Sequence, residues 1–296
     1  MSASIIDGKQ VASDIRKELK QEVADLKAKG ITPGLAVILV GDNPASKSYV
    51  TAKEKACAEV GIMSDDNRLP ANTTEEELLT LIDKLNKRDD IHGILVQLPL
   101  PKHIDENKVI MAIAPEKDVD GFHPVNVGRL VIEQQAFLPC TPHGIIQLLQ
   151  RSGVQLDGSH VVIVGRNNIV GKPLLNLLIQ KASSGNATVT LCHTHTRNLA
   201  SYTRQADILI AAAGHPNTIT ANMVREGAVV IDVGVNRVSA PDSPKGYHLV
   251  GDVDFENVKE VASKITPVPG GVGPMTITML LFNTVESAKT ILDKCH

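Results

Sequence analysis

Apolar runs and amphipathic stretches alternate along the whole chain. Continuous apolar runs predict buried strands, and apolar positions spaced three and four residues apart predict helices. The expected strands are 34–40, 63–69, 91–98, 161–164, 188–192, 206–213, 228–233 and 248–253. The expected helices are 9–29, 44–60, one that begins near Thr74, 105–113, 141–153, 172–181 and 275–293. Strands that alternate with helices are typical of parallel sheets with helices on both faces.

This alternation predicts an α/β fold with two three-layer domains and a cleft between them. At 296 residues the chain is long enough to bury a sizeable core, and two domains are expected. The first domain is expected at 1–140, and the second at 141–274.

The strongest local signal lies at residues 161–173. The β-branched run Val161–Val164 is followed by Gly165, where the chain must turn, and by a helix with Pro173 in its first turn. The N-terminus of such a helix offers free N–H groups and a positive dipole end, which suit a phosphate. Five residues separate Gly165 from Gly171, so the spacing differs from the common G-x-G-x-x-G motif. By itself the stretch fits a dinucleotide site or any strand–helix unit of a doubly wound sheet.

The next strand indicates which dinucleotide would bind. An NAD site usually has Asp or Glu about 20 residues further on, where it holds the ribose 2′-hydroxyl. Here the strand 188–192 ends in Cys192 and continues as His-Thr-His-Thr, with no acid. Arg166 directly follows Gly165 and could meet a 2′-phosphate, so the pattern favours NADP. The alternative is that Arg166 is a solvated surface residue.

Composition and charge narrow the classes of partner. The formal net charge is −3 and the isoelectric point is about 6.4, so we expect neither nucleic acid nor an anionic membrane as a partner. The N-terminal residues do not read as a secretion signal, and no apolar run is long enough to span a bilayer. Tryptophan is absent, and Tyr and Phe are few, so stacking platforms for nucleic acid are scarce.

The cysteines and histidines favour neither disulfides nor a metal. The four cysteines are scattered, without a C-x-x-C motif, which fits a reducing cytosol. They are Cys57, Cys140, Cys192 and Cys295. His193 and His195 flank one residue beside Cys192, but an obvious third ligand is missing, so no metal site is expected.

Four polar residues of the first domain are candidates for chemistry. Tyr49 and Lys53 lie four residues apart on a predicted helix, so they share one face near the carboxyl end of a strand. Gln97 ends the apolar strand 91–98, and Asp120 precedes a glycine in an irregular stretch. Each has a plainer explanation: an ordinary helical pair, a buried amide satisfied by backbone, and a common turn.

Residues 266–276 are too rich in Pro and Gly for a helix or a central strand. Such a rigid loop can bring bare backbone close to a ligand. The alternative is a plain crossover between the domains.

Several long motifs together resemble one enzyme family. The chain resembles the bifunctional methylenetetrahydrofolate dehydrogenase/methenyltetrahydrofolate cyclohydrolases over nearly its whole length, with the motifs in the same order. The matching segments are 48–53 (Ser-Tyr-Val-Thr-Ala-Lys), 93–101 (Gly-Ile-Leu-Val-Gln-Leu-Pro-Leu-Pro), 117–122 (Lys-Asp-Val-Asp-Gly-Phe), 139–142 (Pro-Cys-Thr-Pro), 165–173 and 266–276.

The resemblance implies a function and a domain assignment. Such an enzyme oxidises 5,10-methylenetetrahydrofolate to 5,10-methenyltetrahydrofolate with NADP, and then hydrolyses the product to 10-formyltetrahydrofolate. Residues 1–140 would form the folate-binding catalytic domain, to which the final helix, 275–296, returns. Residues 141–274 would form a Rossmann-like NAD(P)-binding domain. The resemblance also implies a cytoplasmic homodimer in one-carbon metabolism that supplies purine biosynthesis.

The resemblance further implies roles for individual residues. The implied catalytic residues are Lys53, Tyr49, Gln97 and Asp120. The implied folate contacts are these four with Val96, Leu98, Gly121, Pro269, Gly270, Gly271, Val272 and Gly273. The implied cofactor contacts are Gly165, Arg166, Asn167, Thr194, Val235 and Thr276. Family members typically have Ser at position 167, where this chain has Asn, so use of NAD stays possible.

Three other functions stay open on the sequence. The chain could be a dehydrogenase without cyclohydrolase activity. It could be another two-domain NADP-dependent enzyme, such as a shikimate dehydrogenase. It could also be a catalytically silent nucleotide-binding or scaffold protein.

Overall fold

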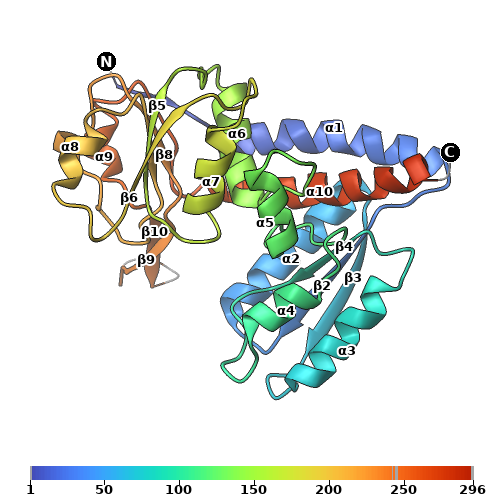
Figure 1. Ribbon diagram of the computed structural model, residues 1–296. Helices are drawn as coiled ribbons and strands as arrows, with labels where there is room; N and C mark the ends of the chain where they lie inside the picture. The colour runs from blue at the N-terminus through green and yellow to red at the C-terminus, as the bar shows by residue number, and fades with distance from the viewer. Residues whose placement is uncertain (1, 242, 244–245, 295–296) are drawn as a thin grey trace. The chain divides into compact units, whose positions relative to one another are not determined.

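The computed structural model describes residues 2–241, 243 and 246–294, which form two compact units (Figure 1). The six-strand unit contains the chain up to residue 12 and residues 141–276. The three-strand unit contains residues 13–140 and the chain from 277 on. The chain passes between the units within three helices, which are α1 (Gly8–Ala28), α6 (Cys140–Arg151) and α10 (Val272–Lys294).

The three-strand unit has a parallel sheet in the order β3-β2-β4. Its strands are β2 (Gly34–Val40), β3 (Met63–Leu69) and β4 (Gly93–Val96). Its remaining helices are α2 (Pro44–Val60), α3 (Glu75–Asn86), α4 (Glu106–Ala112) and α5 (Pro124–Val131). Because the strands are parallel, the residues that follow β2 and β4 emerge at the same edge of the sheet.

Both faces of this sheet are buried, as the continuous apolar strands predict. On one face Ala36, Ile38 and Val40 of β2 pack in a cluster with residues of α3 and α4. The alternate residues Leu35 and Val37 are fully buried on the other face. Within this unit α1 and α10 run side by side (Figure 1), and Arg16 of α1 donates a hydrogen bond to the Thr278 hydroxyl of α10.

The six-strand unit has an all-parallel sheet in the order β1-β11-β8-β7-β5-β6. The strands are β1 (Ser4–Ile5), β5 (His160–Val164), β6 (Thr188–Cys192), β7 (Ile208–Ala211), β8 (Val229–Asp232) and β11 (Lys264–Ile265). The helical segments are α7 (Gly171–Leu178), α8 (Leu199–Thr203), η1 (Ala221–Met223) and α9 (Phe255–Val258). The strands β9 (Asn236–Ser239) and β10 (Tyr247–Val250) form a separate antiparallel hairpin.

Two parts of this unit differ from what the sequence predicts. The sequence groups the first twelve residues with the first domain, but β1 pairs with β11 and places them in the six-strand unit. The segment expected as a strand at 248–253 pairs with β9 in the hairpin, where Arg237 lies 4.9 Å from the centre of the Tyr247 ring.

Two findings bear on compartment and partners. In the part of the chain that the structure describes, no helix has both the length and the hydropathy of a membrane span. Cys57, Cys140 and Cys192 are buried free thiols, and Cys295 lies outside the described residues.

Candidate functional site

Lys53 is a buried amine on α2. Asn43 caps this helix, because its side-chain oxygen accepts hydrogen bonds from the N–H groups of Ala45 (2.9 Å) and Ser46 (3.3 Å), and Pro44 occupies the first turn. The helix turns Lys53 inward with Val50, so that the lysine is only 8% exposed. Lysines are rarely buried to this extent unless their charge has a partner or is lost.

Gln97 is the partner of Lys53. It directly follows β4, and its N–H donates to the carbonyl of Ile38 in β2 at 2.8 Å. The side-chain Nε2 donates to the carbonyl of Leu98 at 2.7 Å, which leaves Oε1 to accept from Lys53 Nζ at 3.0 Å. The amide therefore has a fixed orientation and holds the amine without adding charge.

The electrostatics of this pair favour a neutral amine. Burial lowers the pKa of Lys53, and the nearby Asp120 carboxylate opposes part of that shift. Burial raises the pKa of the Asp120 carboxyl group. The charge of Lys53 and a hydrogen bond with Cys140 offset part of this rise. Tyr49, one turn before Lys53 on α2, is 51% exposed and presents its ring at the surface.

A buried carboxyl group shapes the loop that carries Asp120. Asp118 is 2% exposed and accepts hydrogen bonds from the N–H of His123 (2.8 Å) and the side-chain amide of Asn126 (2.9 Å). Burial raises the pKa of Asp118 to about 6. Gly121 has φ +75°, and a Cβ there would lie 2.7 Å from the backbone nitrogen of Pro139. Only glycine fits this contact, so the loop has one tightly determined path.

The first residue of α6 and the final helix hold the same loop. The thiol of Cys140 donates to the carbonyl of Val119 at 3.3 Å. The side-chain amide of Asn283, on α10, donates to the carbonyls of Val119 (2.8 Å) and Leu138 (2.9 Å). Cys140 and Asn283, which lie 21 and 164 positions from Val119, thus fix the backbone next to Asp120.

In the six-strand unit, the turn between β5 and α7 is built on two glycines. Gly165 has φ +132°, and a Cβ there would lie 2.1 Å from the carbonyl oxygen of Ala212. A Cβ at Gly171 would lie 2.0 Å from the carbonyl oxygen of Gly165. A side chain at either glycine would clash with neighbouring backbone, so both glycines are needed for the tight path of the turn.

Asn167 changes the expected phosphate site. The sequence predicts free N–H groups at the start of α7, but Asn167 Oδ1 accepts from the N–H groups of Ile169 (3.2 Å), Val170 (2.6 Å) and Gly171 (3.4 Å). Asn side chains commonly bond the backbone a few residues further on, which explains the difference. Because Oδ1 is engaged, the Nδ2 group of Asn167 is the part of this side chain that can donate to an anion.

The loop after β6 lies near Arg166. The N–H of His193 donates to the hydroxyl of Thr196 at 2.8 Å, and Thr194 is exposed between the two histidines. Partial burial, Arg166 and His195 lower the pKa of His193, in that order. Arg166 is itself exposed. The structure thus brings three of the predicted cofactor contacts, Arg166, Asn167 and Thr194, to the carboxyl edge of β5 and β6.

The sequence missed two buried aspartates that organise the loops after β7 and β8. Asp252 Oδ2 accepts from the N–H groups of Ala213 (2.6 Å) and Gly214 (2.8 Å). Asp232 Oδ1 accepts from the N–H groups of Gly234 (3.0 Å) and Asp252 (2.9 Å). Burial raises the pKa of Asp232 to about 6. The signal was an acid within two residues of a glycine at or just after the end of a strand, in Asp-Val-Gly and Gly-Asp-Val.

The predicted contacts outside these clusters lie on further loops of the six-strand unit, at Val235 and residues 269–271, and at the start of α10. Val272, Gly273 and Thr276 are helical, although the sequence predicts a loop at the first two. Val235 follows β8 and is 50% exposed, and the hydroxyl of Thr276 lies 2.8 Å from that of Thr141. In the loop at residues 269–271, a hydrogen bond joins the N–H of Gly271 to the carbonyl of Pro267 at 2.8 Å. The start of α1 packs on it, since a Cβ at Gly8 would lie 1.7 Å from the carbonyl oxygen of Gly271.

The comparisons with known proteins decide the family. Residues 6–120 match the family model described as tetrahydrofolate dehydrogenase/cyclohydrolase, catalytic domain. Residues 139–292 match the NAD(P)-binding domain of the same family. The chain belongs to the tetrahydrofolate dehydrogenase/cyclohydrolase family. This family membership excludes the alternative that the chain is a shikimate dehydrogenase.

Individual relatives extend over the whole chain. The chain is 62% identical to the bifunctional protein FolD of Geotalea daltonii, over 97% of this chain and 99% of the relative. It is 52% identical to the solved FolD methylenetetrahydrofolate dehydrogenase/cyclohydrolase of Campylobacter jejuni, with a TM-score of 0.92 over 98% and 100% of the two chains. The Trypanosoma brucei FolD, solved with NADP and an inhibitor, is 44% identical, with a TM-score of 0.93 over 99% of each chain.

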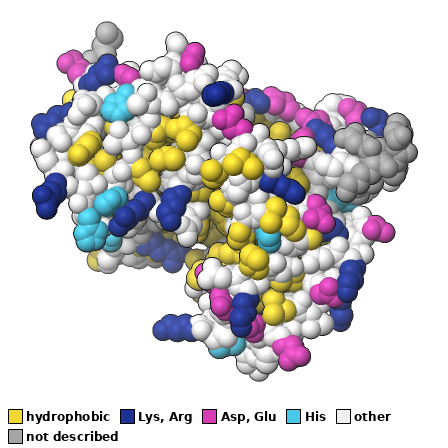
Figure 2. Space-filling view, in the orientation of Figure 1, with side chains coloured by type: hydrophobic (Ala, Val, Ile, Leu, Met, Phe, Trp, Pro, Cys, Tyr) yellow, Lys and Arg dark blue, Asp and Glu magenta, His cyan; other side chains and the backbone are white. Residues whose placement is uncertain are grey.

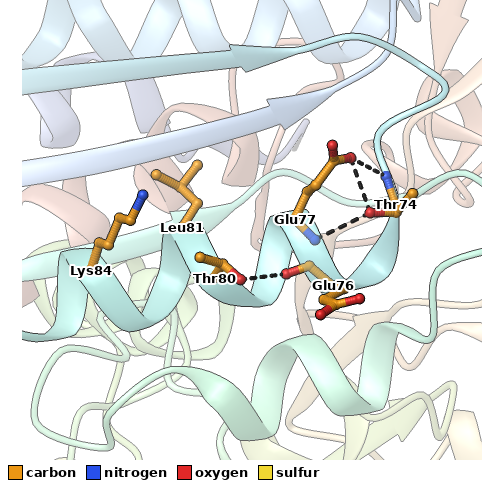
Figure 3. A pocket seen from close by; sticks show the side chains of 6 residues that line it. All are labelled: Thr74, Glu76, Glu77, Thr80, Leu81 and Lys84. Atoms are coloured by element: carbon orange, nitrogen blue, oxygen red, sulfur yellow. Dashed lines mark hydrogen bonds between the residues drawn. The ribbon is translucent and has the colours of Figure 1, made fainter.

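A hollow on α3 does not coincide with any of these clusters. It has a volume of about 510 Å³ and is open along one side of the helix (Figure 3). Its lining residues are Thr74, Glu76, Glu77, Thr80, Leu81 and Lys84. Thr74 and Glu77 bond each other in a capping box at the helix start, so these polar groups serve the helix (Figure 3). Among the described residues, no group of three or more His, Cys, Asp or Glu could hold a metal ion.

Proposed function

We propose that the chain oxidises 5,10-methylenetetrahydrofolate to the methenyl compound with NADP, and then hydrolyses that compound to 10-formyltetrahydrofolate. The observation that carries the proposal is the part-buried hydrogen bond of 3.0 Å between Lys53 and Gln97 in a member of this family. Burial lowers the pKa of Lys53 and so favours the neutral amine, which is the base that ring opening by water requires.

The residues of the six-strand unit fit a dinucleotide with a 2′-phosphate. Bound NADP supplies the carbon that accepts a hydride from the folate. The turn held by Gly165 and Gly171 lies at the carboxyl end of β5, where parallel sheets place the pyrophosphate of a dinucleotide. Arg166, Asn167 Nδ2 and the Thr194 hydroxyl can donate to the 2′-phosphate, and no acid in the loop after β6 would repel it. We assign contacts with the rest of the dinucleotide to Val235 and Thr276.

The oxidation needs no acid or base from the protein. Hydride leaves the carbon that bridges N5 and N10 of the folate, and a methenyl cation forms. The protein contributes orientation and the exclusion of water. We assign folate binding to Tyr49, Val96, Leu98, Asp120, Gly121 and residues 269–273. The exposed ring of Tyr49 offers a stacking surface, and the Asp120 carboxyl group can bond the pterin.

The hydrolysis needs a base for one proton. The oxygen of water attacks the methenyl carbon, a C–O bond forms, and neutral Lys53 takes the proton that water loses. The bond from this carbon to N5 then breaks, its electron pair stays on N5, and N5 is protonated as the formyl C=O forms on N10. N5 takes the proton that the hydroxyl group on this carbon loses, and Lys53 then releases its own proton to solvent, which accounts for the one proton that the net reaction produces. The positive charge of the substrate favours the neutral amine further.

The charge at position 97 offers a test of this role. In a Gln97→Glu variant, a carboxylate would lie about where Oε1 lies now, 3.0 Å from Lys53 Nζ. An adjacent opposite charge raises a lysine pKa by one to three units, so the neutral fraction at pH 7.5 falls roughly 10- to 1,000-fold. We expect hydrolysis of methenyltetrahydrofolate, followed by its absorbance, to fall accordingly and to recover as the pH rises towards 10.

Gln97→Met is the matched control, because it removes the hydrogen bond without adding a charge. We expect it to lower the rate while the midpoint of the pH profile stays within about half a unit of wild type. A Gln97→Glu profile that superimposes on the wild-type profile would contradict proton transfer through Lys53.

The finer assignments are proposals of the same kind. We propose that the chain prefers NADP to NAD, acts as a homodimer in the cytoplasm and supplies one-carbon units for purine biosynthesis. The family resemblance supports these assignments, and the three buried free thiols fit a reducing compartment. The intact Lys53–Gln97 pair argues against a member that lacks the cyclohydrolase activity.

A further inference from the structure

The loop after β6 carries a pair of histidines to which the function has given no role. His193 and His195 flank Thr194, at the edge of the sheet where Arg166 also lies. Figure 2 shows histidine side chains beside Lys or Arg side chains on the lower part of this unit. None of the residues 192–198 is acidic, so the loop presents only neutral or positive groups.

The rings of His193 and His195 differ in the hydrogen bonds that they make. The backbone N–H of His195 donates to Nδ1 of His193 at 3.1 Å, which places the ring proton of His193 on Nε2. Protonation of His193 at Nδ1 would break this bond. Among the described residues no hydrogen bond reaches the ring of His195, which is exposed. Both ring nitrogens of His195 are therefore available to a ligand without loss of a hydrogen bond among the described residues.

The charged groups near His193 also disfavour a second proton on its ring. The charged or titratable groups that act on its ring are Arg166, from the turn after β5, and His195, from its own loop. Together with partial burial they lower the pKa of His193. With Nδ1 engaged as an acceptor, His193 contributes an Nε2–H donor, and its ring lies 6.2 Å from that of His195 in an edge arrangement.

We propose that His195 takes up a proton from solvent when a dinucleotide with a 2′-phosphate binds, and so makes the preference for NADP over NAD depend on pH. The inference rests on the proposed function, because it assumes that NADP occupies this edge of the sheet. The imidazolium forms an N–H bond with the incoming proton and donates to the phosphate dianion. NAD has a 2′-hydroxyl where NADP has the 2′-phosphate, so we expect no proton uptake when NAD binds.

The direction of the proton exchange shows whether the imidazole or the phosphate changes its protonation. A phosphate monoester has a second pKa near 6, and positive neighbours lower it, so the phosphate itself can only release a small fraction of a proton at pH 7.5. An imidazole next to a dianion gains one to three pKa units and takes up on the order of half a proton. Net uptake therefore reports the imidazole.

The experiment is calorimetric titration of the full chain with NADP and with NAD at pH 7.5, in two buffers of different ionisation enthalpy. The difference between the buffers gives the protons exchanged per dinucleotide. We expect uptake with NADP, none with NAD, and loss of the uptake in His195→Gln. The same variant should bind NADP roughly tenfold more weakly at pH 6.5 and bind NAD within about twofold of wild type.

His160→Gln is the matched control. His160 belongs to the same unit but begins β5, whereas Gly165 and Arg166 follow the end of that strand. We expect this variant to keep the wild-type proton uptake. Binding of NADP without proton uptake, uptake that persists in His195→Gln, or equal loss of NADP and NAD binding in that variant would overturn the inference and leave the proposed function standing. Failure of the wild-type protein to bind NADP would overturn both.

Discussion

A Lys53→Met variant should lose ring opening and keep oxidation. Methionine fills a similar volume and has no proton-accepting amine, and removal of a general base typically costs 10²- to 10⁴-fold in rate. The oxidation needs no base, so we expect part of the dehydrogenase activity to survive. The measurement is paired: reduction of NADP with 5,10-methylenetetrahydrofolate, and hydrolysis of added methenyltetrahydrofolate.

Lys55→Met provides the control for this variant. Lys55 lies two residues further along α2, is exposed, and undergoes the same chemical change. We expect both activities of Lys55→Met to match wild type. Hydrolysis that persists at the wild-type rate in Lys53→Met would remove Lys53 from the mechanism.

The largest effect on stability is expected for Gly165→Ala. The residue has φ +132°, which alanine rarely adopts, and the new Cβ would lie 2.1 Å from the carbonyl oxygen of Ala212 in the neighbouring backbone. Backbone strain and overpacking each cost about 1–3 kcal/mol, so the free energy of unfolding of the six-strand unit should fall by about 2–6 kcal/mol. Urea unfolding followed by circular dichroism measures this change, and NADP binding should be lost with it.

Gly158→Ala is the control, because it introduces backbone strain without a close contact like that between residue 165 and Ala212. Gly158 also has a positive φ, +75°, but no atom lies within 4 Å of the position of its Cβ. We expect the strain alone there, about 1 kcal/mol. Equal destabilisation by the two variants would show that the approach of Ala212 to Gly165 does not matter.

The sequence predicted those elements whose signals are local. The strands 34–40, 63–69 and 188–192 were predicted with the bounds that the structure shows, because apolar or alternating residues end at turn residues. The helix 44–60 was bounded by Pro44 at its start and Gly61 at its end, which has φ +88°.

The missed elements depend on distant partners or on short segments. The strands β1 and β11 contain two residues each; β1 pairs with β11 across about 260 positions of sequence, and β11 also pairs with β8. The helix α5 was missed within an irregular stretch, although Pro124 in its first turn is a recognised start signal. Local patterns cannot specify a two-residue strand, because tertiary pairing supplies its stability.

For the site, residue types were predictable and their electrostatics were not. The i, i+4 pair and the strand end singled out Lys53 and Gln97, and the structure joins them by a hydrogen bond. The cap that Asn167 forms on α7, and the bonds of Asp252 to the loop after β7, depend on side-chain orientation. Sequence spacing does not determine that orientation.

The most direct test of the central claim, two consecutive activities on one chain, is a progress curve with 5,10-methylenetetrahydrofolate, run separately with NADP and with NAD. Reduced dinucleotide and methenyltetrahydrofolate are followed together. The account predicts faster reduction with NADP and less than one methenyltetrahydrofolate accumulated per reduced dinucleotide, because the same protein consumes it. Stoichiometric accumulation would contradict the cyclohydrolase activity, and no reduction with either dinucleotide would contradict the dehydrogenase activity.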